Sequence, residues 1–275
     1  MDKIKNHAQI FLLITGLFFF GWTIHAVGFE KLRVLGPALA GPGILVFGVY
    51  PLVCIWDVLG WRVLFARKWQ SKVNFAELYY IRLAGEALNN ITPFVDIGGE
   101  FLKVTLASKR FSMEKRKALI TVVMARTALF FSEIFFWIAG LSLIFFLFPI
   151  PRRWFFIFLG TIAGFVAVSA VISMVQKKGL FGTLIRWLER LRINPEFFER
   201  FQISLKEVDE EIAAFHFKKT ARFFQTVALH FLGWVGGGFE TYFMFRMVGA
   251  PISLLEGILL EAILQLTRTV SFFIP

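Results

Sequence analysis

The sequence predicts an all-α integral membrane protein, a polytopic helix bundle, and two features carry that prediction. Hydrophobic residues occupy 57% of the 275 positions and charged residues only 18%, which leaves too little polarity to cover a soluble domain of this length. Several apolar segments also reach the roughly 20 residues that are needed to cross about 30 Å of hydrocarbon. These predicted spans are residues 9–28, 42–65, 118–148, 154–176 and 220–248.

Lysine and arginine are distributed unequally between the loops that join these spans. They gather after the second span, before the third and after the fourth, whereas the opposite loops carry few. Because cytoplasmic loops of membrane proteins retain the positive charge, the N-terminus is predicted to be cytoplasmic. The net charge of +11 is then explained by loops that face anionic headgroups, and nucleic acid is not expected as a partner.

The longest stretch outside the predicted spans is 177–218. Apolar residues at helical spacing over 180–191 predict an amphipathic helix in the cytoplasmic interface, and the Asn-Pro pair at 194–195 ends it. A second amphipathic helix is expected over about 196–216. The stretch is interpreted as a connector, with a regulatory or partner-binding surface as the alternative.

Residues 74–102 are too polar for a lipid-facing helix, although basic cytoplasmic loops flank them on both sides. Pro93 and the pair Gly98-Gly99 would break a helix at membrane depth. Non-helical backbone is tolerated at that depth only where it is buried in protein or lines a water-filled cavity. The sequence therefore predicts a re-entrant helical hairpin, with a helix lying flat on the cytoplasmic surface as the alternative.

Residues 251–275 repeat the pattern of 74–102. They are again amphipathic, carry glutamate and arginine, and reach a proline at Pro275. Aligning Pro275 with Pro93 makes the two copies enter the membrane from opposite faces, because two spans precede the first copy and five precede the second. The pattern predicts an inverted-topology repeat with re-entrant broken helices, which is typical of secondary transporters.

The whole chain is therefore predicted to form a single transmembrane domain, residues 1–275. Repeat one covers about 1–148 and repeat two about 154–275, with the cytoplasmic insertion at 177–218 inside repeat two. The second copy is expected to be incomplete, because its hairpin lacks a returning half.

The stretch 87–110, ALNNITPFVDIGGEFLKVTLASKR, resembles the Asn-Asn-x-x-Pro, Gly-Gly-Glu and Lys/Arg signature of the flippase-like family. That family is also called the lysylphosphatidylglycerol synthase transmembrane family. Residues 121–133 resemble its next helix, with Arg126 at the arginine position, but the acidic residue that usually follows soon is delayed to Glu133. Residues 231–275 resemble the hopanoid-biosynthesis-associated branch. The resemblance implies a bacterial inner-membrane protein that handles a phospholipid, hopanoid or polyprenyl-phosphate lipid.

Ionisable side chains at membrane depth cost roughly 2.5–3.5 kcal/mol each on the insertion scale, so they normally face one another or a wet cavity. A guanidinium suits two-pronged phosphate binding, which makes Arg126 a predicted headgroup contact. The alternative is that Arg126 pairs permanently with Asp57 or Glu133. Amide side chains and backbone N–H groups are expected to bind headgroup oxygens. The predicted substrate-binding residues are Arg82, Glu86, Asn89, Asn90, Thr92, Pro93, Gly98, Gly99, Glu100, Lys103, Arg126 and Glu133.

No motif of catalysis, cofactor binding or metal binding accompanies these residues. The four histidines lack metal-ligand spacing, and no P-loop, H-E-x-x-H or nucleophile elbow is present. The leading hypothesis is therefore a non-enzymatic lipid flippase that moves an amphiphilic lipid between leaflets. The alternatives are a membrane-embedded lipid-modifying transferase and a non-catalytic scaffold that binds lipid-biosynthesis enzymes.

Overall fold

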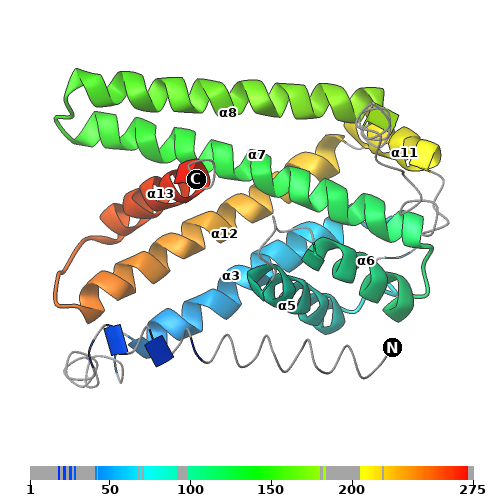
Figure 1. Cartoon of the computed structure of the whole chain (residues 1–275), viewed down its shortest axis with the longest axis horizontal. Helices are drawn as coiled ribbons and strands as arrows, with labels where there is room; N and C mark the ends of the chain where they lie inside the picture. Colours follow the sequence, from blue (N-terminus) through cyan, green and yellow to red (C-terminus); the bar gives the residue numbers. More distant parts are fainter. Residues whose placement is uncertain are drawn as a thin grey trace.

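The computed structural model describes residues 43–66, 71–91, 98–179, 205–218 and 220–271, together with a few isolated positions outside these ranges. The regular structure of this described part is helical (Figure 1), which confirms the predicted all-α membrane fold. The helices are α3 (Ile44–Leu64), α5 (Phe75–Ile91), α6 (Gly98–Arg110), α7 (Lys115–Leu147), α8 (Arg152–Lys178), α11 (Leu205–Lys218), α12 (Thr220–Met247) and α13 (Leu254–Ser271).

Three helices of the described part are long and apolar enough to cross a membrane, namely α3, α7 and α8. They confirm the second, third and fourth predicted spans. The fifth predicted span corresponds to α12, which is not among the three, although its 28 residues give it a length of about 42 Å. The first predicted span lies almost wholly outside the described residues.

The most extensive packing in the bundle is between α3 and α12, which lie side by side and run in opposite directions (Figure 1). Small residues allow this close approach. Thr226 on α12 donates its hydroxyl to the Gly60 carbonyl at 3.1 Å, and a Cβ on Gly236 would come within 2.8 Å of an α3 side chain. On the other side of α12, a Cβ on Gly257 would lie 2.8 Å from the Gly238 carbonyl. α12 is therefore held tightly between α3 and α13.

The predicted hairpin at 74–102 corresponds to the paired helices α5 and α6. Asn74 starts α5 by accepting the Ala76 N–H at 2.8 Å, the usual role of an asparagine at a helix N-terminus. The two helices touch through glycines, because a Cβ on Gly99 would collide with the Gly85 carbonyl oxygen. The connection between them, which contains Pro93, lies outside the described residues.

α7 runs through the bundle and joins its two hydrophobic clusters. One cluster gathers buried residues of α3, α5, α6, α11 and α12 around the first half of α7. The other packs the second half of α7, including the fully buried Trp137, against α13. α8 forms an outer layer that contacts α7 and α11 (Figure 1), and its apolar side chains such as Phe156 and Met174 remain exposed. Such a large uncovered apolar face is the surface that a bilayer accommodates.

α11 belongs to the second predicted amphipathic helix, and it packs into the bundle. Val208 and Ile212 are fully buried in the larger cluster. Arg116 at the start of α7 forms ion pairs with Glu207 and, at 3.6 Å, with Glu211. This helix is therefore fixed against α7, whereas almost all of the first predicted amphipathic helix lies outside the described residues.

Candidate functional site

A cavity of about 650 Å³ lies between α3, α5, α6, α7, α12 and α13, and we call it the central cavity. α5 and α6 border it from one end of the bundle, and α13 borders it from the other (Figure 1). Its lining is unusually rich in ionisable side chains for a bundle of apolar helices. The charged residues that line it are Asp57, Arg82, Glu86, Glu100, Lys103, Arg126, Glu240, Glu261 and Arg268.

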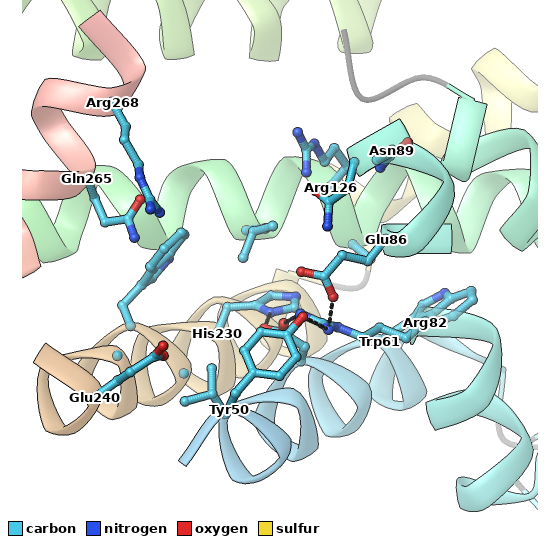
Figure 2. Close-up of a pocket in the computed structure, with 18 of the residues that line it drawn as sticks. Tyr50, Trp61, Arg82, Glu86, Asn89, Arg126, His230, Glu240, Gln265 and Arg268 are labelled. Atoms are coloured by element: carbon cyan, nitrogen blue, oxygen red, sulfur yellow. Dashed lines mark hydrogen bonds and ion pairs between the residues drawn. The ribbon is translucent and has the colours of Figure 1, made fainter. Parts of the chain in front are cut away.

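Asp57 on α3 is the centre of a polar network at the wall of the central cavity, and Figure 2 labels its two partners, Arg82 and His230. One of its carboxylate oxygens accepts the Nη2–H of Arg82 from α5 at 2.8 Å. The other lies 3.0 Å from Nδ1 of His230 on α12. Asp57 therefore connects three helices, and a neutral His230 would donate its Nδ1–H to the carboxylate.

Arg82 is engaged through both terminal nitrogens of its guanidinium, Nη1 and Nη2. Besides Asp57, it pairs through Nη1 with Glu86 one turn along α5 and donates to the Tyr50 hydroxyl at 3.1 Å. The same nitrogen lies 2.9 Å from the Cys54 sulfur. Because these contacts join α5 to α3, the geometry gives Arg82 a role in holding the wall of the cavity, and its predicted substrate contact stays a prediction.

The predicted residues of the α5–α6 hairpin are brought to one wall of the cavity. Asn89 lines the cavity and accepts the Gly99 N–H on its Oδ1 at 2.6 Å. This backbone donor, which the sequence suggested for a headgroup oxygen, is thus already bonded within the protein. Lys103 and Glu100 form an ion pair of 2.9 Å on α6 and also line the cavity.

Arg126 and Glu133 lie seven residues apart on α7 but have different surroundings. Arg126 lines the central cavity, and Glu133 does not. Glu133 accepts the hydroxyl of Thr269 on α13 at 3.1 Å and interacts electrostatically with Arg126. The carboxylate of Asp57 contacts Arg82 and His230, and the alternative that Arg126 pairs permanently with Asp57 or Glu133 stays a prediction.

The opposite wall of the cavity comes from α12 and α13 and contains residues that were not among the predicted binding residues. Both oxygens of Glu261 accept hydrogen bonds of 2.6 Å, one from the Thr241 hydroxyl and one from the Gln265 amide. Glu240 and Arg268 line the same wall (Figure 2) and interact electrostatically. Glu261 and Arg268 belong to the amphipathic segment 251–275, whose charged residues the sequence analysis noted without assigning them to a binding site.

The remaining predicted binding residues have different positions. Asn90 lines the cavity. Gly98 begins α6 and is not among the lining residues. Thr92 and Pro93 lie outside the described residues. Within the described part, no group of three or more histidine, cysteine, aspartate or glutamate side chains is arranged to hold a metal ion.

The sequence matches one protein-family model over almost its whole length. The model describes the lysylphosphatidylglycerol synthase TM region, and it matches residues 9–275. No similar curated protein and no similar solved structure was found. The match agrees with the motif at 87–110 and with the membrane-spanning helices. The chain therefore belongs to the family of the lysylphosphatidylglycerol synthase TM region, a family of membrane proteins with a lipid-related function.

Proposed function

We propose that this protein moves an amphiphilic lipid between the leaflets of a bacterial inner membrane, with the lipid headgroup in the central cavity. One observation carries the proposal: a cavity of about 650 Å³ lined by charged residues lies among helices whose outer faces are apolar. Each ionisable group placed at membrane depth costs roughly 2.5–3.5 kcal/mol. Such a cost is accepted where a polar ligand or water must enter, and a lipid headgroup is the polar ligand that a membrane supplies.

The arrangement of the short helices supports translocation over simple binding. α5 and α6 have 17 and 13 residues and therefore lengths of about 26 and 20 Å, shorter than the hydrocarbon core of about 30 Å. They border the cavity from one end, and α13 borders it from the other (Figure 1). We infer that both are re-entrant elements, related by the antiparallel pair α3 and α12 as an inverted repeat. Two such elements would give each leaflet access to one cavity.

The proposal also includes the orientation of the protein in the membrane and the class of lipid that it moves. The basic loops favour a cytoplasmic N-terminus, because retained positive charge marks the cytoplasmic side. The resemblance of residues 231–275 to the hopanoid-associated branch supports a hopanoid, phospholipid or polyprenyl-phosphate lipid as the cargo. The charged lining would contact the polar end of any of these lipids, and the acyl or isoprenoid chains would stay in the bilayer.

Lipid flux in liposomes that contain the full chain tests the proposal. Fluorescent phospholipid in the inner leaflet should become accessible to an external quencher much faster than in protein-free liposomes. Leu129→Trp, which fills space at the cavity wall, should slow this flux. Val166→Trp on the exposed face of α8 is the matched control, because Val166 is 46% exposed and does not line the cavity.

Two results would contradict the proposal. Equal lipid flux for the Leu129→Trp and Val166→Trp variants would show that transport does not depend on the central cavity. Conversion of labelled lipid precursors to a new product, without flux, would favour the transferase hypothesis.

A further inference from the structure

Asp57 lies where a firmly packed part of the bundle meets a less firmly packed one. Its contact with His230 joins α3 to α12, and these two helices share the most extensive packing of the described part. Its contact with Arg82 joins α3 to α5, which pack against each other far less extensively. The contact with Arg82 is therefore the one that separates more readily when helices move.

His230 fixes the carboxylate of Asp57 but has no place for a second proton of its own. Its side chain is 4% exposed, and its Nδ1 lies 3.0 Å from one Asp57 oxygen, Oδ1. The other ring nitrogen, Nε2, is buried without a hydrogen-bond partner among the described residues. It lies against Gly60, where a Cβ would come within 3.2 Å of it. A second N–H on the ring would be a buried donor without an acceptor, which is costly, so a neutral His230 fits this arrangement.

Arg82 covers the other oxygen of Asp57, Oδ2, at 2.8 Å. It also pairs with Glu86, one turn along the same helix, and Figure 2 labels Arg82, Glu86 and His230 around this network. With His230 neutral, the ionised side chains of the network are Asp57, Glu86 and Arg82. They leave an excess of one negative charge, so one more proton would balance the network.

We propose that lipid movement by this protein is coupled to protons, and that a proton binds to Oδ2 of Asp57 when α5 separates from α3. This inference rests on the proposed function and adds its source of energy. When α5 leaves, Arg82 stays paired with Glu86 on the same helix, whereas Asp57 loses its contact with a cation. A buried carboxylate in that condition takes up a proton, here from water in the cavity. When α5 returns, Arg82 displaces the proton, which leaves into the cavity.

The titratable and charged side chains around Asp57 come from α3 and from the three helices that pack on it. They are Tyr50 and Cys54 on α3, Arg82 and Glu86 on α5, Arg126 on α7 and His230 on α12. Glu86 keeps its cation when α5 moves, because Arg82 moves with it. Arg126 interacts electrostatically with Glu133 on its own helix. Asp57 is therefore the carboxylate whose charge balance changes with the position of α5.

The distribution of lipid under a pH difference tests the coupling. Liposomes that contain the full chain carry a trace of fluorescent phosphatidylcholine, and valinomycin with equal potassium on both sides removes the membrane potential. The fraction of probe in each leaflet is read at steady state with an external quencher, so the direction in which the protein is inserted does not matter. A difference of about one pH unit should shift the ratio between leaflets, by up to about tenfold for one proton per lipid. Reversing the pH difference should reverse the shift, and a protonophore should abolish it.

Asp57→Asn keeps the shape of the side chain but cannot take up a proton. Whatever its rate of lipid flux, this variant should give the same lipid distribution in both directions of the pH difference. Glu114→Gln is the matched control, because this carboxylate is 58% exposed, pairs with Lys117 and does not line the cavity. It should shift as the unmodified protein does.

Infrared spectroscopy of the purified full chain in detergent tests the proton site without lipid flux. Arg82→Gln removes the cation from Oδ2 of Asp57, so an additional band of a protonated carboxyl group should appear at neutral pH. Glu86 also loses Arg82 in this variant, and two double variants separate the carboxylates. The band should be absent when Asp57→Asn is added and should remain when Glu86→Gln is added instead. Melting temperatures of all variants show whether the fold is intact.

The inference is overturned if the lipid distribution of the unmodified protein ignores the pH difference or if that of Asp57→Asn follows it. It is also overturned if the additional infrared band is missing or persists without Asp57. The proposed function fails separately. The band without any lipid flux would keep Asp57 as a proton site and reject translocation, whereas flux that ignores the pH difference would keep translocation and reject coupling.

Discussion

Replacement of Asp57 by asparagine removes the charge that joins α3, α5 and α12. The side chains of Asp57 and Arg82 are 18% and 15% exposed and lie 2.8 Å apart. A pair with its charges about 4 Å apart interacts by about 4 kcal/mol at an effective dielectric constant of about 20, and breaking a buried pair costs about 3–5 kcal/mol. Arg82 keeps Glu86 as a partner, so we expect Asp57→Asn to lower the free energy of unfolding by about 2–3 kcal/mol.

The free energy of unfolding can be measured by equilibrium titration of mixed micelles with SDS, followed by circular dichroism. Glu114→Gln is the control, because this carboxylate is 58% exposed and pairs with Lys117 at 2.7 Å on the surface. Its loss should stay below about 1 kcal/mol. The double variant Asp57→Asn, Arg82→Gln should be more stable than the sum of the single losses predicts, by about 1–2 kcal/mol. If Asp57→Asn lowers the free energy of unfolding no more than the control does, or if the losses of the two single variants simply add, the network does not hold α3, α5 and α12 together.

Three further predictions follow from packing and topology. Gly99→Ala should destabilise the protein, because the added Cβ would collide with a backbone carbonyl of α5. Gly164→Ala on α8 is the control, because this glycine has open space around it, and the change should be neutral or stabilising by up to about 1 kcal/mol. Equal thermal stability of the two variants would argue against the close contact between α5 and α6. Ile212→Ala should cost about 2–5 kcal/mol, since this α11 side chain is fully buried, and a change below about 0.5 kcal/mol would show that α11 does not pack on the bundle. In a Cys54→Ser background, Ser71→Cys should react with a membrane-impermeant maleimide only after the cytoplasmic side is opened, and labelling of intact cells would invert the topology.

The spans were the easiest part of the fold to predict from the sequence. α3, α7 and α8 match their predicted ranges because a run of about 20 apolar residues is a local property with a local consequence in a bilayer. The pair α5 and α6 was predicted from polar residues within 74–102, but α6 continues to Arg110, into residues that the sequence analysis assigned to a basic loop. The burial of α11 was not predicted, because Val208 and Ile212 find their partners only on distant helices.

In the candidate site, too, the sequence predicted which residues are ionisable at membrane depth but not which distant residues they contact. Arg82, Glu86 and Arg126 were identified from the cost of ionisable groups at membrane depth, and all three line the cavity. The sequence did not show that Arg82 is bound to Asp57. His230 was also missed as a member of the site, since its contact with Asp57 spans 173 positions of sequence and no local pattern records it.

The sequence by itself determined that this is a helical membrane protein, where its apolar spans lie, and that charged side chains lie within those spans. The physical reason is that transfer of each residue into hydrocarbon has a free energy that depends mainly on that residue and its near neighbours. Only the tertiary structure decided which charges neutralise each other and which face the cavity. That outcome depends on how closely α3, α12 and α13 approach, and the glycines at 236, 238 and 257 permit that approach only against the particular helices they meet.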